Sequence, residues 1–175
     1  MGVTVTPISV GTGQSVVRHH QGAGRVGWVA HPRFYVHERQ ERRPMGSPGG
    51  MPRFGTVVTC IDGRVQEPVA RWLKQTYQLD YVDVITEPGP DRFLSENGGG
   101  RVRAIRDMVD ISLNAHHSNL LAIAGHHDCA ANPVSTNEHL EQIRKAVQVI
   151  RFWNLPVTVV GLWVNDAWRV ETVAG

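Results

Sequence analysis

Two short stretches of the sequence carry side chains that could together bind a metal ion. Residues 60–64 (CIDGR) place a thiol, a carboxylate and a guanidinium at alternate positions, and residues 125–129 (GHHDC) add two imidazoles and a second thiol. Alternate residues of an extended strand point to the same side. Thiolate and imidazole ligands suit Zn²⁺, and three protein ligands leave a fourth tetrahedral position open, as in catalytic zinc sites.

The zinc hypothesis selects Cys60, His126 and Cys129 as ligands. His126 and Cys129 have the His-x-x-Cys spacing, which lets two side chains reach one ion across a single turn. His127 is the alternative, and we prefer His126 because it follows the glycine at the end of a predicted strand. Plainer explanations stay open: a buried cysteine, an Asp that caps a helix, a solvated Arg, polar loop histidines, or a disulfide between the only two cysteines.

Hydrophobic patterning explains how stretches 66 positions apart could meet. The alternation of strands and helices predicts an α/β fold with three layers (αβα) and a central, mostly parallel sheet of about four strands plus a C-terminal edge strand. The carboxyl ends of parallel strands share one rim, where such sheets bind ligands. The predicted elements are strands at 54–60, 81–86, 120–124 and 156–164, helices starting at 67–68, at 101 and after the capping box at 135–138, a loop at 91–100 and an edge strand within 168–173.

Composition excludes several classes of protein. The 175 residues carry a formal net charge of +2 and only two cysteines, which excludes a disulfide-rich secreted scaffold. Residues 1–50 hold six Arg and two Glu, so the remainder, with 12 basic and 14 acidic residues, has no basic stripe for nucleic acid. We see no apolar run long enough to span a membrane and no secretory signal, and therefore expect a cytoplasmic protein without a membrane partner.

The sequence changes character near residue 52. Residues 1–52 are rich in Gly, Pro, Arg and His and predict a flexible, disordered N-terminal extension, whereas residues 53–175 have the regular pattern of a single zinc domain. The extension is either an arm that docks on a partner subunit or sequence upstream of a biological start at Met45 or Met51. Its four histidines are more simply explained as polar residues than as a functional metal site: His19, His20, His31 and His37.

The two motifs, at residues 60–64 and 125–129, together resemble those of the β-class carbonic anhydrases. The resemblance covers roughly residues 54–164, includes the order of the strands, and extends to a compact bacterial branch of that family. It implies an enzyme, a carbonic anhydrase (carbonate dehydratase, a zinc lyase), which reversibly hydrates carbon dioxide to bicarbonate by a zinc-bound hydroxide. It also implies a homodimer or a higher homo-oligomer.

The same resemblance implies a role for each site residue. Cys60, His126 and Cys129 would be the zinc ligands. Asp62 would accept a hydrogen bond from zinc-bound water, and Arg64 would hold Asp62 by a charge-assisted pair. In the family the Asp can also move onto the zinc, so the position of Asp62, on or off the metal, stays open.

Other functions fit the same residues. A carbon disulfide or carbonyl sulfide hydrolase could use this zinc scaffold, because both substrates are linear like carbon dioxide. A non-catalytic, zinc-binding bicarbonate sensor and a dithiol redox protein are further alternatives. His127, Asp128 and His139 are candidate proton-relay groups, while Trp163 and Trp168 are expected in the core or at a dimer interface.

Overall fold

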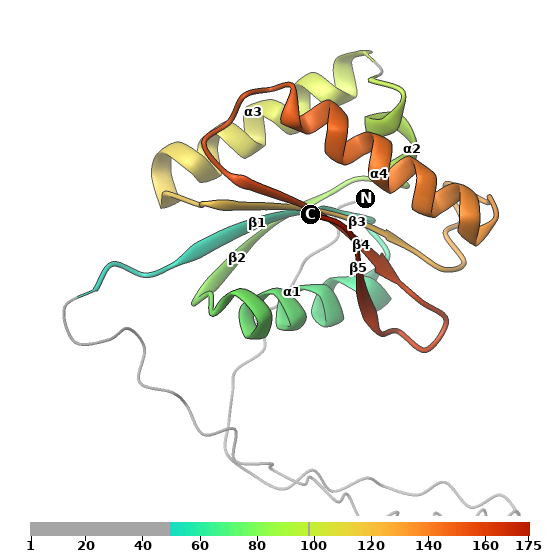
Figure 1. Ribbon diagram of the computed structural model, residues 1–175, viewed down its shortest axis with the longest axis horizontal. Coiled ribbons are helices and arrows are strands. Elements are labelled where there is room, and N and C mark those ends of the chain that lie inside the picture. Colours follow the sequence, from blue (N-terminus) through green and yellow to red (C-terminus); the bar gives the residue numbers. More distant parts are fainter. Residues whose placement is uncertain (1–49, 98) are drawn as a thin grey trace, which may run out of the picture. The chain divides into compact units, whose positions relative to one another are not determined.

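The computed structural model describes residues 50–97 and 99–175, which form a five-stranded sheet between two layers of helices (Figure 1). The sheet order is β2-β1-β3-β4-β5, in which only β5 is antiparallel to its neighbour. This confirms the predicted fold class. The elements are β1 (Phe54–Thr59), α1 (Gly63–Tyr77), β2 (Tyr81–Thr86), α2 (Pro90–Ser95), α3 (Gly99–His116), β3 (Leu120–His126), α4 (Thr136–Arg151), β4 (Thr158–Val164) and β5 (Val170–Ala174).

The core lies in two clusters, one on each face of the sheet. Helix α1 covers one face and α2, α3 and α4 cover the other (Figure 1). Successive strand residues point to opposite faces, so Val57 belongs to the cluster under α1 and Val58 to the cluster under α3 and α4. Strand β3 is buried along its whole length, as expected for a central parallel strand covered on both sides.

Several predicted boundaries were wrong, including the start of β4, which is Thr158 and not residue 156. Residues 91–100 do not form a continuous loop, since α2 spans Pro90–Ser95 and α3 already begins at Gly99. Helix α1 begins at Gly63, four residues before the predicted start, because the Asp62 carboxylate caps it. Strand β3 extends to His126, which is therefore the last residue of the strand and not part of the turn.

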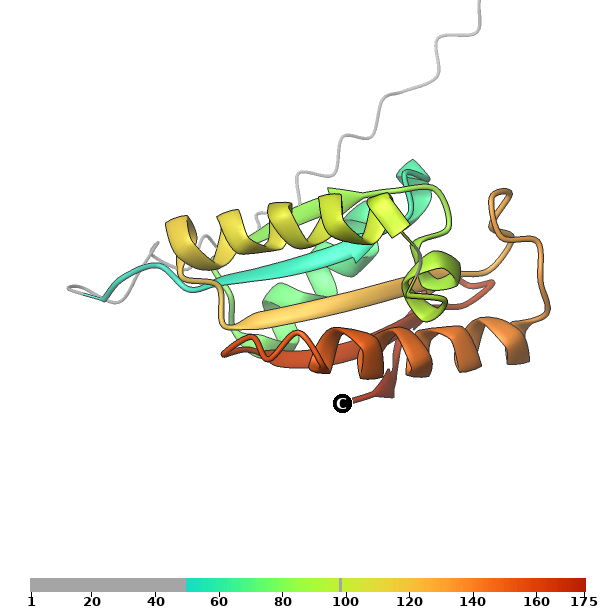
Figure 2. The ribbon, with the colours of Figure 1, turned by 90° about the horizontal axis from the view of Figure 1, so that it is seen from above.

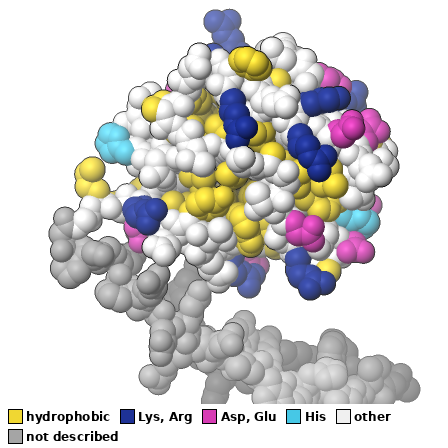
Figure 3. All heavy atoms as spheres, in the orientation of Figure 1, with side chains coloured by type: hydrophobic (Ala, Val, Ile, Leu, Met, Phe, Trp, Pro, Cys, Tyr) yellow, Lys and Arg dark blue, Asp and Glu magenta, His cyan; other side chains and the backbone are white. Residues whose placement is uncertain are grey.

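The predicted N-terminal extension, at residues 1–52, lies almost wholly outside the described residues. This holds also for its four histidines. Gly50, Met51 and Pro52 are described, and they are exposed and outside any helix or strand. Among the described residues, no helix is both long enough and apolar enough to cross a membrane. Figure 3 shows basic and acidic side chains interspersed on one face of the molecule.

Replacing Gly161 with alanine should destabilise the fold, because β4 lies directly under α4 at this position. A Cβ atom there would lie 2.6 Å from Ile143 Cγ2 and 3.0 Å from Val147 Cγ2. Overpacking of this kind costs about 1–3 kcal/mol of unfolding free energy. Gly100→Ala is the matched control, since no described atom lies within 4 Å of its added Cβ and alanine favours a helix by about 0.5–1 kcal/mol. Urea denaturation measures both; equal stability of the two variants would contradict the packing described here.

Candidate metal centre

The ends of the adjacent parallel strands β1 and β3 bring Cys60, His126 and Cys129 together. Cys60 directly follows β1, His126 ends β3, and Cys129 lies in the turn that follows. One ligand atom of each residue lies within 4.8 Å of the others, and the two Sγ atoms are 3.9 Å apart. All three side chains are buried, and the cysteines form no disulfide. His127 is exposed and lies outside this cluster.

The hydrogen bonding of His126 leaves one ring nitrogen available for a ligand. Nδ1 lies 2.7 Å from the carbonyl oxygen of His127, so Nδ1–H is the donor and Nε2 carries the free lone pair. Nε2 is buried and has no hydrogen-bond partner among the described residues. Histidines that bind metals usually donate their other ring N–H to a carbonyl or carboxylate, as here. An orphaned imidazole nitrogen beside two thiols therefore fits a zinc ion.

Burial sets the protonation of the candidate ligands in the metal-free protein. It lowers the pKa of His126, so the ring is neutral and able to bind a metal. It raises the pKa of the Cys129 thiol to about 11, and the nearby Cys60 adds to this effect. The backbone N–H groups of Ala131 and Asn132 act in the opposite direction, since they stabilise a thiolate at Cys129.

Zinc affinity should rise with pH. A thiol with a pKa of about 11 holds its proton at pH 7, and the metal must displace that proton because the thiolate is the ligand. Each displaced proton weakens apparent binding about tenfold per unit of falling pH, so at least that slope is expected between pH 8 and pH 7. Competition with a chelator of known pH dependence measures it, and a pH-independent affinity would contradict this assignment of the ligands.

Asp62 and Arg64 form a bidentate ion pair next to the cluster. Arg64 Nη2 lies 2.6 Å from Asp62 Oδ2, and Nε lies 3.0 and 3.1 Å from the two carboxylate oxygens. Arg64 also donates its backbone N–H to Asp62 Oδ1, which caps α1. The Arg64 hydrogen bonds hold the pKa of Asp62 at about 2, so the carboxylate is ionised at neutral pH. The charge of Asp62, two residues from Cys60, also acts to raise the pKa of His126.

The three relay candidates lie in different settings. His127 is exposed, and Asp128 is exposed with an oxygen 3.4 Å from Arg64 Nη1. His139 is buried, and its Nδ1 lies 2.5 Å from the buried carboxylate of Asp91. Trp163 is also buried, in agreement with its predicted place in the core. Its ring packs against that of His139, with the two ring centroids 5.1 Å apart.

Sequence reasoning missed Asp91 and Asn132, which brace the turn that carries Cys129. Asn132 Nδ2 donates to Asp91 Oδ2 at 3.0 Å, and the Asn132 backbone N–H donates to the Cys129 carbonyl at 3.1 Å. A Cβ atom on Gly125 would lie 3.1 Å from Asp91 Oδ2, so the carboxylate lies against the end of β3. Figure 2 shows α2, which carries Asp91, at the rim where β1 and β3 end. No motif in the sequence indicated that this Asp is buried.

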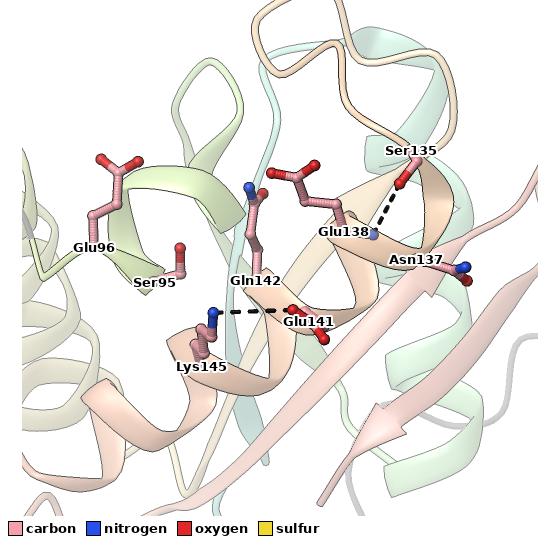
Figure 4. A pocket seen from close by; sticks show the side chains of 8 residues that line it. All are labelled: Ser95, Glu96, Ser135, Asn137, Glu138, Glu141, Gln142 and Lys145. Carbon is pink, nitrogen blue, oxygen red and sulfur yellow. Dashed lines mark hydrogen bonds and ion pairs between the residues drawn. The ribbon is translucent and has the colours of Figure 1, made fainter.

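A polar groove between α2 and α4, of about 490 Å³, is separate from the metal cluster (Figure 4). None of the five predicted site residues lines it. Gln142 connects it with the interior, because its Oε1 accepts a hydrogen bond of 2.7 Å from Asn132. The lining residues are Ser95, Glu96, Ser135, Asn137, Glu138, Glu141, Gln142 and Lys145.

Residues 51–174 match the model of the protein family described as "Putative carbonic anhydrase". The chain belongs to this family. The match covers the whole described domain, including both motifs, and confirms the resemblance to β-class carbonic anhydrases. A search of curated proteins found no match.

Solved structures similar to this carbonic anhydrase family member include three carbonic anhydrases. The β-carbonic anhydrase isoform I of Trichomonas vaginalis is 15% identical with a TM-score of 0.49, and the match covers 74% of this chain and 86% of that one. The carbonic anhydrase of Glaciozyma antarctica is 15% identical with a TM-score of 0.45, and the match covers 74% of this chain and 89% of that one. The β-carbonic anhydrase CafA of Aspergillus fumigatus is 15% identical with a TM-score of 0.42, and the match covers 79% of this chain and 84% of that one.

Proposed function

We propose that this protein is a zinc-dependent β-class carbonic anhydrase that reversibly hydrates carbon dioxide to bicarbonate. The observation that carries the proposal is the buried Cys60–His126–Cys129 cluster with its orphaned imidazole nitrogen. Membership of a carbonic anhydrase family supports it. In this proposal the catalytic domain is residues 53–175, and it works in the cytoplasm as a homodimer or a higher homo-oligomer.

In this proposal Cys60, His126 and Cys129 hold the zinc ion. Bound zinc supplies the acidity that makes water a nucleophile at neutral pH. As two thiolates and one neutral imidazole, these residues would supply three ligands and would leave room for one small ligand. The Nδ1–H bond of His126 to the His127 carbonyl fixes the ring orientation that this requires.

In this proposal Asp62 and Arg64 select which small ligand binds beside Cys60, His126 and Cys129. An ionised carboxylate only accepts hydrogen bonds, so Asp62 favours an incoming group that has a proton to donate. Water has such a proton, whereas a fully deprotonated anion has none. Arg64 holds both Asp62 oxygens in the fork geometry that a guanidinium provides, with Nε bonded to Oδ1 and Nη2 to Oδ2, and so fixes the direction in which the carboxylate accepts.

A substrate panel tests the proposed reaction. The zinc-loaded full chain is given carbon dioxide, carbonyl sulfide and carbon disulfide separately, with hydration followed by stopped flow and hydrolysis by sulfide release. We expect carbon dioxide to give the highest kcat/KM. Turnover of the sulfur compounds alone would assign the scaffold to hydrolysis, and tight zinc binding without any turnover would favour a sensor.

A further inference from the structure

Arg64 is held from three sides, and one of its contacts comes from the C-terminal hairpin. Its Nε and Nη2 atoms bond to Asp62, and its Nη1 lies 3.4 Å from Asp128 Oδ2. The Trp168 ring packs against the guanidinium, with Arg64 Cζ 4.7 Å from the ring centroid. The Arg64 side chain is 50% exposed, so without these contacts it would be free to leave Asp62 for water.

Trp168 lies in a turn that is stabilised by hydrogen bonds among residues 165–169, and this turn positions it for the contact with Arg64. In the turn between β4 and β5, Asn165 Oδ1 accepts the backbone N–H groups of Ala167 and Arg169, each at 3.0 Å. The Trp168 backbone N–H donates to the Asn165 carbonyl oxygen at 2.9 Å. The indole also packs against the core cluster that contains Cys60 and Cys129.

The backbone at this position is unusual for a large side chain. Trp168 has φ 56°, in the left-handed region that bulky residues rarely adopt. Asp128, the other residue that contacts Arg64 from a distant part of the chain, has φ 57°. Strained backbone persists where surrounding contacts over-determine it, and it clusters at functional sites. Of the six described non-glycine residues with positive φ, these two turn their side chains to the Arg64 guanidinium.

We propose that Trp168 is a positioning residue, which holds Arg64 and thereby keeps the Asp62 carboxylate directed beside the metal centre. The proposal rests on the proposed function for the role of Asp62, but the contact itself does not. Asp62 is two residues from Cys60, and carboxylate oxygens are ordinary zinc ligands. If the Arg64 side chain is released, the one described hydrogen bond that Asp62 keeps is that from the Arg64 backbone N–H to Oδ1, so Oδ2 becomes free and loss of Trp168 favours Asp62 as an additional ligand.

The first test uses the metal-free, full-length chain and side-chain ¹⁵N NMR. In the wild type, ring current from Trp168 should shift the Arg64 Nε–H resonance upfield, and exchange of this proton with water should be slowed. Trp168→Phe keeps an aromatic face, whereas Trp168→Leu keeps only apolar volume. We expect Phe to retain the slowed exchange and Leu to speed it by about two- to fivefold, the change expected for loss of an exposed cation–π contact.

Trp153→Leu is the matched control. Trp153 also lies under a guanidinium, with Arg106 Cζ 5.7 Å from its ring centroid, but it packs on the opposite core cluster. This variant should leave the Arg64 resonance unchanged. An Arg64 Nε–H that shows no ring-current shift in the wild type, or equal exchange in the Phe and Leu variants, would overturn the proposal.

The second test measures the coordination of a metal ion bound at the site. In Co²⁺-loaded protein, Trp168→Leu should change the visible absorption bands, since the metal gains a carboxylate ligand, and the double variant Trp168→Leu/Asp62→Asn should reverse that change. Unchanged cobalt bands in Trp168→Leu would refute the link from Trp168 to Asp62. If the NMR and cobalt results hold while the wild type hydrates no carbon dioxide, the proposed function fails and the positioning role stands.

Discussion

Replacing His126 with alanine should remove zinc from the protein, whereas replacing the adjacent His127 should leave the zinc content unchanged. The two histidines are neighbours of the same type, but only His126 is buried with its Nε2 free of hydrogen bonds from the described residues. Loss of a group that merely orients a ligand weakens metal binding about 10–100-fold, so loss of the ligand itself should cost at least about 100-fold.

Metal analysis by mass spectrometry, after dialysis against a weak chelator, measures both variants. His126→Ala should retain less than about a tenth of the zinc of the wild type, given that loss of affinity. Carbon dioxide hydration should fall with it, and His127→Ala should match the wild type in both respects. Zinc retained by His126→Ala, or lost equally from both variants, would show that the ligand set is assigned incorrectly.

Replacing Asp62 with asparagine should separate activity from metal binding. Asparagine has nearly the same shape, but it loses the charge that pairs with Arg64 and can present an N–H donor where an acceptor is needed. Loss of a positioned acid–base group typically costs 10²–10⁴ in rate, and we expect kcat/KM to fall by about 100-fold or more. Zinc content should stay at the wild-type value, because Asp62 is not in the ligand cluster.

Two further variants sharpen this test. Asp107→Asn makes the same chemical change on the exposed surface of α3 and should leave kcat/KM unchanged. Arg64→Lys keeps the positive charge but loses the fork that bonds to both Asp62 oxygens, so it should lose activity as well. Full activity of Asp62→Asn would remove Asp62 from the mechanism, and loss of zinc from it would make Asp62 a ligand.

The convergence of the metal cluster was predictable because it follows from general geometry. Continuous apolar runs indicated the parallel strands, and the carboxyl ends of such strands share one rim. Cys60 and His126 could therefore lie close together once both strands were placed in one sheet, and the structure makes β1 and β3 neighbours. The chemical types of the side chains then indicated the metal, and the choice of His126 over His127 agrees with their burial.

Helix α2 and its buried Asp91 were not predictable from local pattern. The six residues of α2 begin with the last proline of a Pro-Gly-Pro run and end shortly before three glycines, and they are too few to show a helical period. The helix depends on tertiary burial of Leu94 and on the pairing of Asp91 with His139. The same limit applies to Trp168, whose contact with Arg64 joins positions that only the folded sheet brings together.

The rate of carbon dioxide hydration through one cycle of metal removal and return tests the central claim most directly. The full-length chain is measured by stopped flow at pH 8 as zinc-loaded protein, after removal of zinc with a chelator, and after addition of one equivalent of zinc. We expect activity in the first state, the uncatalysed rate in the second and recovery in the third. Zinc-loaded protein that hydrates carbon dioxide no faster than buffer would contradict the proposed function.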